Sequence, residues 1–166
     1  MNLLYLRPTF KPLIIFMKRF LALLILPLFI GCNLSDDLNI LNQGEEDILK
    51  YLEENDLEAT KTATGLYYVV HEQGDGAPIG SDSTVTVAYK GYFLNGIVFD
   101  KSGPDGITFN LNQVIPGWTE GIPYFNEGGK GMLLIPPSLG YGAAGNQRIP
   151  GGAVLVFDIE ILKTNT

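Results

Sequence analysis

The side chains that most often act as nucleophiles or metal ligands are scarce in this sequence. Among its 166 residues there is one cysteine, Cys32, and one histidine, His71. A single histidine cannot assemble a multi-histidine metal site. A Ser-His-Asp or Cys-His catalytic site would have to use His71, which lies beside a glycine-rich turn. These counts argue against a multi-histidine metal site and a histidine-activated nucleophile. We expect no metal and no cofactor, and a lone cysteine allows no disulfide within the chain.

Aromatic residues and one acid form a second group of candidates. Phe99, Trp118 and Phe157 each fit a hydrophobic core as well as the wall of a binding cleft. Asp100, directly after Phe99, also fits the end of a strand, and Tyr141, in a Leu-Gly-Tyr-Gly run, also fits a packed loop. Taken one at a time, these residues do not distinguish a role in the hydrophobic core from a role in a binding cleft.

The charge of the chain argues against nucleic acid as a partner. The net charge is −7, and the first 31 residues hold four bases and no acid. The remaining residues hold 7 bases and 18 acids, a net charge of −11. Such a body repels phosphate groups and anionic lipid surfaces.

The elements that position the candidate residues are predicted strands and one short helix. Alternation of period two over residues 84–90 predicts a half-buried strand. Asn95-Gly96 predicts a hairpin with a type I′ turn. Further strands are predicted at residues 66–70, 131–135 and 153–162. A helix beginning near Trp118 must cover the apolar face of this antiparallel sheet, which makes the domain α+β.

Seven short runs follow one another from residue 87 onward. They are 87–91 (VAYKG), 95–100 (NG…FD), 114–118 (VIPGW), 128–130 (GGK), 135–136 (IP), 141–142 (YG) and 155–158 (LVFD). In this order and spacing they resemble the FKBP-type peptidyl-prolyl cis-trans isomerase domain, over about residues 64–163. The resemblance implies a strongly bent antiparallel sheet wrapped around one short helix, here assigned to residues 64–166 with a helical extension before it.

The same resemblance implies an aromatic cleft for proline. Trp118 is expected as its floor, and Tyr89, Phe99 and Phe157 as its walls. Asp100 is expected near the carbonyl before proline, and Tyr141 near the peptide. These six are the expected catalytic residues. The implied substrate-binding set is Tyr89, Phe99, Asp100, Ile107, Val114, Ile115, Trp118, Tyr141, Ile149 and Phe157.

Three departures from the family pattern bear on ligand preference. The segment between Asp100 and Phe109 is about two residues shorter than is usual in the family that the sequence resembles. Ile107 stands where a phenylalanine commonly lines the pocket, and Asn146 stands near a frequent histidine position. Macrolide inhibitor binding is implied by the family, and these departures bear on its affinity.

Rotation about an X-Pro amide suits a site without nucleophiles. No bond is made or broken, and the twisted transition state is less dipolar than the planar amide, so a dry cleft favours it. The sequence therefore predicts a peptidyl-prolyl isomerase acting on unfolded, proline-containing exported or cell-envelope proteins. A proline-binding chaperone and an interaction lipoprotein with little or no catalysis are the alternatives.

The N-terminal segment reads as a targeting signal. Lys18-Arg19 precedes an apolar run over residues 20–30, too short for the about 20 residues of a membrane-spanning helix. Gly31-Cys32 then resembles a lipoprotein box. We expect a signal peptide over residues 1–31, with translation starting at Met17, and a lipid on Cys32. The alternative is an ordinary signal peptide or membrane anchor in which Cys32 occurs by chance.

The segment after Cys32 is expected to be a tether. Residues 32–63 hold polar residues and a predicted short helix at 45–56. The protein is thus expected in the cell envelope, lipid-anchored to the outer membrane. The acidic run over residues 35–37 resembles a surface-export signal, and a periplasmic position is the alternative.

Overall fold

The computed structural model describes residues 43–165. The predicted signal peptide, Cys32 and residues 33–42 of the tether lie outside these residues. Helix α2 (Glu45–Glu54) comes first, where the sequence predicts a helix. The strands are β1 (Thr60–Lys61), β2 (Tyr67–Glu72), β3 (Thr84–Phe93), β4 (Val98–Lys101), β5 (Ile107–Asn110), β6 (Lys130–Ile135) and β7 (Leu155–Asn165). Helix α3 (Pro116–Gly121) lies between the short 3₁₀ helices η1 (Leu111–Gln113) and η2 (Ile122–Tyr124), and a third, η3 (Pro137–Leu139), follows β6.

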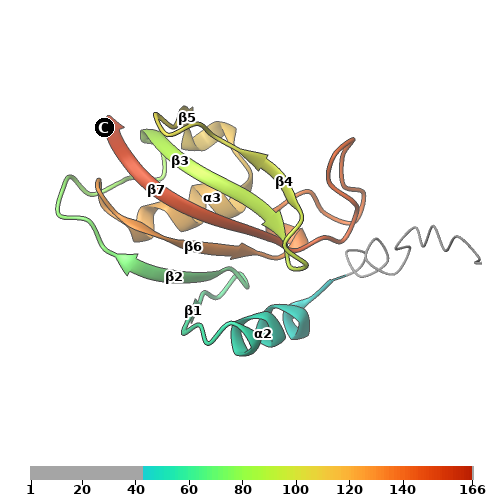
Figure 1. Cartoon of the computed structure of the whole chain (residues 1–166). Helices are drawn as coiled ribbons and strands as arrows, with labels where there is room; N and C mark the ends of the chain where they lie inside the picture. The colour runs from blue at the N-terminus through green and yellow to red at the C-terminus, as the bar shows by residue number, and fades with distance from the viewer. Residues whose placement is uncertain (1–42, 166) are drawn as a thin grey trace, which may run out of the picture. The chain divides into compact units, whose positions relative to one another are not determined.

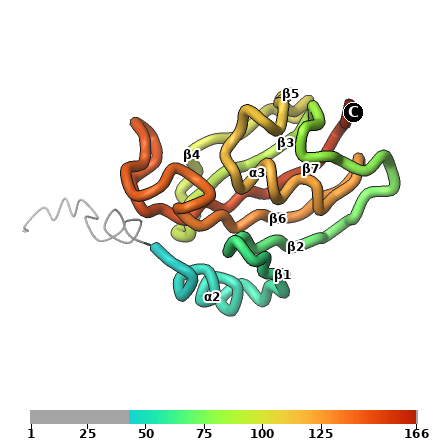
Figure 2. The backbone as a smooth tube through the Cα atoms, turned by 180° about the vertical axis from the view of Figure 1, so that it is seen from behind, coloured from blue at the N-terminus to red at the C-terminus, as the bar shows by residue number. Residues whose placement is uncertain are grey.

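The strands form one antiparallel sheet in the order β1-β2-β6-β7-β3-β4, with β5 also pairing with β3. The long strands β3 and β7 curve across helix α3 (Figure 1), and Figure 2 shows the same helix from behind. Register shifts at Thr86/Val87 and Gly91/Tyr92 add twist to β3. The predicted α+β fold, a bent antiparallel sheet with one short helix, is confirmed. No helix within residues 43–165 is long and apolar enough to cross a membrane.

The hairpin between β3 and β4 forms where Asn95-Gly96 predicts it, but its turn is not type I′. Phe93 N donates to Ile97 O at 3.0 Å and Gly96 N donates to Phe93 O at 2.8 Å, which makes a three-residue loop. Gly96 has φ +84°, whereas Asn95 keeps a negative φ. The Asn95 side chain accepts a hydrogen bond from Ile97 N at 3.1 Å, which supports the longer loop.

Alternating residues of β7 explain why one face of the sheet closes on α3. Leu155, Phe157, Ile159 and Ile161 are buried in the core that also holds Trp118, as the sequence predicts. Close contact between helix and sheet depends on small residues. A Cβ at Gly117 of α3 would lie 2.5 Å from Ile135 Cγ2 of β6.

The opposite face of the sheet has a second core beneath α2. Ile48 is fully buried and Leu52 is 7% exposed, packed with residues of β2, β6 and β7. The helix is also tied to the sheet by polar contacts, because Glu45 Oε1 accepts hydrogen bonds from Lys61 Nζ at 2.5 Å and Tyr67 Oη at 2.8 Å. The sheet is therefore covered by a helix on each face, and α2 contributes to the same folded unit.

Candidate active site

A cleft of about 630 Å³ opens at one end of helix α3. Residues of β3, β4, β5, β7, η1 and α3 form it, together with the loop between η3 and β7. The lining residues are Tyr89, Phe99, Asp100, Phe109, Gln113, Val114, Ile115, Pro116, Trp118, Tyr141, Asn146, Arg148, Ile149 and Phe157. Most of these side chains are aromatic or aliphatic, so the cleft excludes water from whatever apolar group enters it.

Trp118 lies at the centre of the aromatic group. Its side chain is 4% exposed. The rings of Tyr89, Phe109 and Phe157 surround it with centroids 5.2, 5.3 and 5.3 Å away, all edge-on. Edge-to-face packing is a favoured aromatic geometry and holds each ring in one orientation. The cleft thus has a rigid floor and rigid walls.

Local sequence places Trp118 in this position. Pro116 occupies the first turn of α3, where its fixed φ favours helix initiation and its missing N–H costs nothing. Ile115 ends the preceding extended segment, and its carbonyl accepts from Trp118 N at 2.9 Å. The VIPGW run therefore begins the helix and places the indole at the floor of the cleft.

Gly91 brings the outer wall together. It pairs with Asp100 of β4 on one side and with Phe157 of β7 on the other. A Cβ at this position would lie 2.7 Å from the ring of Phe99 and 2.8 Å from the ring of Phe157. Because glycine has no side chain, these two rings pack across it with centroids 5.5 Å apart.

Tyr89 and Asp100 form the polar pair of the cleft. Tyr89 Oη donates to Asp100 Oδ2 at 2.8 Å, and Lys101 N donates to Asp100 Oδ1 at 3.0 Å. Burial, followed by the hydrogen bond to Asp100, raises the pKa of the Tyr89 phenol well above its usual range. The phenol therefore stays protonated and keeps the carboxylate oriented.

One buried donor in the cleft has no partner. The indole Nε1–H of Trp118 makes no hydrogen bond within residues 43–165. A buried unsatisfied donor costs free energy, and a bound carbonyl group that reached it would recover that cost. In the same part of the chain, no three His, Cys, Asp or Glu side chains gather to hold a metal ion.

The structure brings nine of the ten residues implied by the resemblance into this one cleft. Ile107 is the exception, with 42% of its surface exposed. It begins strand β5, which pairs with β3 alone and therefore lies at an edge of the sheet. Phe109, two residues along the same strand and therefore on the same face, meets Trp118 instead. The aromatic side chain of Phe109 was the feature of the sequence that could have identified it as a cleft residue.

Four other lining residues were not predicted as site residues. Gln113 and Pro116 flank the Val114-Ile115 pair, so the motif itself pointed to them. Asn146 and Arg148 lie in the loop between η3 and β7, whose irregular path is set by hydrogen bonds within the loop rather than by the period of a helix or strand.

Comparison with known proteins finds the family that the sequence motifs resemble. The family model described as FKBP-type peptidyl-prolyl cis-trans isomerase matches residues 76–162. The FKBP-type peptidyl-prolyl cis-trans isomerase FkpA of Escherichia coli K12 is 46% identical over 123 residues, which are 72% of this chain and 44% of that protein. FkpA of Buchnera aphidicola from Baizongia pistaciae is 41% identical over 122 residues, 72% of this chain and 48% of the relative.

A solved structure of such a relative has the same fold. The crystal structure of FkpA from Escherichia coli superposes with a TM-score of 0.68 at 39% identity, covering 79% of this chain and 62% of that one. A peptidyl-prolyl cis-trans isomerase from Pseudomonas syringae gives a TM-score of 0.65 at 27% identity, covering 73% and 92%. The chain spans about half the length of the curated relatives it matches.

Proposed function

The chain belongs to the FKBP-type peptidyl-prolyl cis-trans isomerase family, and we propose that it accelerates rotation about X-Pro bonds in unfolded or partly folded proteins. The observation that carries this proposal is the aromatic floor around Trp118, enclosed on three sides by rings held edge-on. A pyrrolidine ring fits such a cleft, and the reaction needs no nucleophile or metal.

The physical basis of catalysis is differential solvation. Resonance holds the X-Pro amide planar with a barrier of roughly 18–20 kcal/mol. The twisted transition state loses that resonance and part of its dipole. Removal of water by the cleft therefore raises the free energy of the transition state less than that of the planar amide. A thousandfold acceleration requires about 4 kcal/mol, which desolvation and one or two hydrogen bonds can supply.

We assign roles to the lining residues on this basis. Trp118 supports the proline ring, and Tyr89, Phe99 and Phe157 fix its orientation. Asp100, held by Tyr89, presents a fixed carboxylate beside the amide. Backbone groups of Val114 and Ile115 and the hydroxyl of Tyr141 offer hydrogen bonds to the peptide, and Ile149 closes the rim.

Cis-to-trans relaxation of Xaa-Pro peptides, followed in a protease-coupled assay, tests this function. The purified protein is expected to accelerate relaxation saturably, and Asp100→Leu and Tyr141→Phe are expected to lower kcat/KM while circular dichroism stays unchanged. A well-folded protein that accelerates none of several Xaa-Pro peptides would contradict the isomerase proposal. A proline-binding chaperone would then account better for the cleft.

We further propose that the protein is lipid-anchored in the cell envelope through Cys32. The support is the sequence before it, a basic pair followed by an apolar run and Gly31. Mass spectrometry of the membrane-extracted protein is expected to find a diacylglycerol on Cys32, and Cys32→Ala is expected to release the protein from the membrane fraction. An unmodified Cys32 in the mature protein would contradict this assignment.

A further inference from the structure

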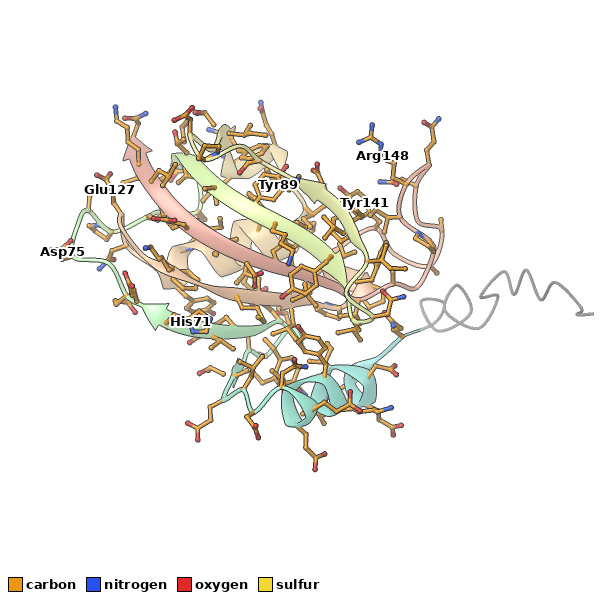
Figure 3. The ribbon with its side chains drawn as sticks, in the orientation of Figure 1. His71, Asp75, Tyr89, Glu127, Tyr141 and Arg148 are labelled. Atoms are coloured by element: carbon orange, nitrogen blue, oxygen red, sulfur yellow. The ribbon has the colours of Figure 1, made fainter. Side chains whose placement is uncertain are left out.

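Arg148 differs from every other residue that lines the cleft. It is the single charged residue between positions 131 and 157, and its side chain is exposed. Among residues 43–165 its guanidinium group has no hydrogen-bond or ion-pair partner. Arg148 and Tyr141 come from the same loop and lie at the same end of the molecule (Figure 3). An unpaired cation therefore stands at the cleft.

The backbone beneath Arg148 is fixed. Asn146 Oδ1 accepts hydrogen bonds from Arg148 N and Ile149 N, both at 2.8 Å, and Asn146 N donates to Ile149 O at 2.8 Å. The base of the loop is closed by Gly152 N, which donates to Gly142 O at 2.9 Å. Because the turn is closed by side-chain and backbone bonds, the arginine projects from a defined place.

Contacts from the segment before α2 hold the end of this loop as well. Gln43, which is 8% exposed, donates its backbone N–H to Gly152 O at 2.8 Å. Its side-chain Oε1 accepts from Val154 N at 3.0 Å. The loop that carries Arg148 is thus ordered before any ligand arrives, which lowers the entropy cost of using it.

The other charged residue of the cleft, Asp100, forms no ion pair with Arg148. Both oxygens of Asp100 accept hydrogen bonds, from Tyr89 Oη and Lys101 N. Residues 43–165 carry 7 basic and 16 acidic side chains, a net charge of −9. Exposed charges are screened beyond about 10 Å at 0.1 M salt, so an acidic side chain that enters beside Arg148 meets the guanidinium rather than the net charge of the whole body.

We propose that Arg148 is a specificity-determining residue that favours X-Pro segments with an aspartate or glutamate next to the proline. The guanidinium fork matches a carboxylate in two parallel hydrogen bonds, which lysine cannot reproduce. A basic residue at the same place meets a like charge and is disfavoured. This proposal rests on the proposed isomerase function and specifies its substrate class.

Exchange NMR on short peptides tests it without a coupling protease. Two series place Glu, Gln or Lys directly before or directly after proline, and a Leu-Pro peptide reports isomerase activity itself. For exposed pairs of this kind we expect kcat/KM for the Glu peptide to exceed that for the Gln peptide by about two- to fivefold, with the Lys peptide lowest, in one series or both. The preference should shrink as salt is raised.

Matched variants separate this role from general charge. Arg148→Gln is expected to make kcat/KM equal for the Glu and Gln peptides. Arg148→Lys should retain part of the preference for the Glu peptide, and Arg148→Glu should reverse it. Lys163→Gln removes the same charge from an exposed position of β7 outside the cleft and should leave the ratio unchanged. Equal Glu and Gln rates in the wild type, or a ratio that survives Arg148→Gln, overturn the proposal. A wild-type protein that does not accelerate isomerisation of the Leu-Pro peptide would instead overturn the isomerase function.

Discussion

Adding one methyl group at Gly91 probes how tightly the walls of the cleft are packed. The new Cβ would lie 2.7 Å from Phe99 Cε2 and 2.8 Å from Phe157 Cε1. Carbon atoms prefer separations of about 3.5–4.0 Å, so each ring must move by roughly 0.7–1.3 Å. Both rings also pack in the core, and neither can move without disturbing Trp118 or Phe93.

Overpacking of this kind lowers the free energy of unfolding by about 1–3 kcal/mol. A loss of about 2 kcal/mol lowers the urea midpoint by roughly 1 M for a domain of this size. Because the displaced rings form the cleft, we also expect kcat/KM on a Leu-Pro peptide to fall by about tenfold, equivalent to about 1.4 kcal/mol. Urea denaturation followed by fluorescence, and the isomerase assay well below the midpoint, measure the two effects.

Gly103→Ala is the matched control for Gly91→Ala. Neither glycine has a positive φ, and a Cβ at Gly103 meets nothing within 4 Å. The control is expected to be as stable as the wild type or slightly more so, because alanine restricts the unfolded chain. A Gly91→Ala protein with the stability and activity of the Gly103→Ala protein would refute the tight packing of Phe99 and Phe157.

Three further perturbations test the polar pair and helix α2. Tyr89→Phe removes the hydrogen bond to Asp100 and should cost about 0.5–1.5 kcal/mol of stability and lower kcat/KM; unchanged kcat/KM would mean that the carboxylate needs no support. Because the raised pKa keeps Tyr89 protonated and no group of the proposed mechanism acts as an acid or base, kcat/KM should stay flat between about pH 6 and pH 9, and a bell-shaped profile would contradict this. Ile48→Ala removes a fully buried side chain and should cost about 2–5 kcal/mol and speed hydrogen exchange in α2. Leu49→Ala, at a residue 49% exposed, should change little, and equal effects of the two would place α2 away from the sheet.

The sequence predicted most of the strands, because their periodicity reflects burial on one face, but it did not predict the short strands β1 and β5. Val85 and Val87 alternate with less buried threonines, and the structure buries both valines fully. The helix at Trp118 was predictable from Pro116-Gly117 for a local reason, since proline favours the first turn.

The features that the sequence did not reveal depend on side-chain contacts that its periodicity does not encode. The hairpin has a three-residue loop, supported by the hydrogen bond from Ile97 N to the Asn95 side chain. The Asn-Gly pair alone does not distinguish this loop from a two-residue turn. Phe109 rather than Ile107 meets the indole, and Ile107 stays 42% exposed at the start of strand β5. The positions of Asn146 and Arg148 follow from hydrogen bonds that close a loop of irregular backbone.

Strand β7 links the two faces of the sheet. Val156 of β7, like Val154 just before the strand, is buried in the core beneath α2, whereas Phe157 forms a wall of the cleft on the other face. Successive side chains of a strand point to opposite faces, so a contact that fixes the valines also fixes the backbone from which Phe157 projects. Gln43 and Ile48 hold that backbone from the outer side. Because a desolvating cleft works only while its walls keep their spacing, α2 contributes to the cleft without touching it.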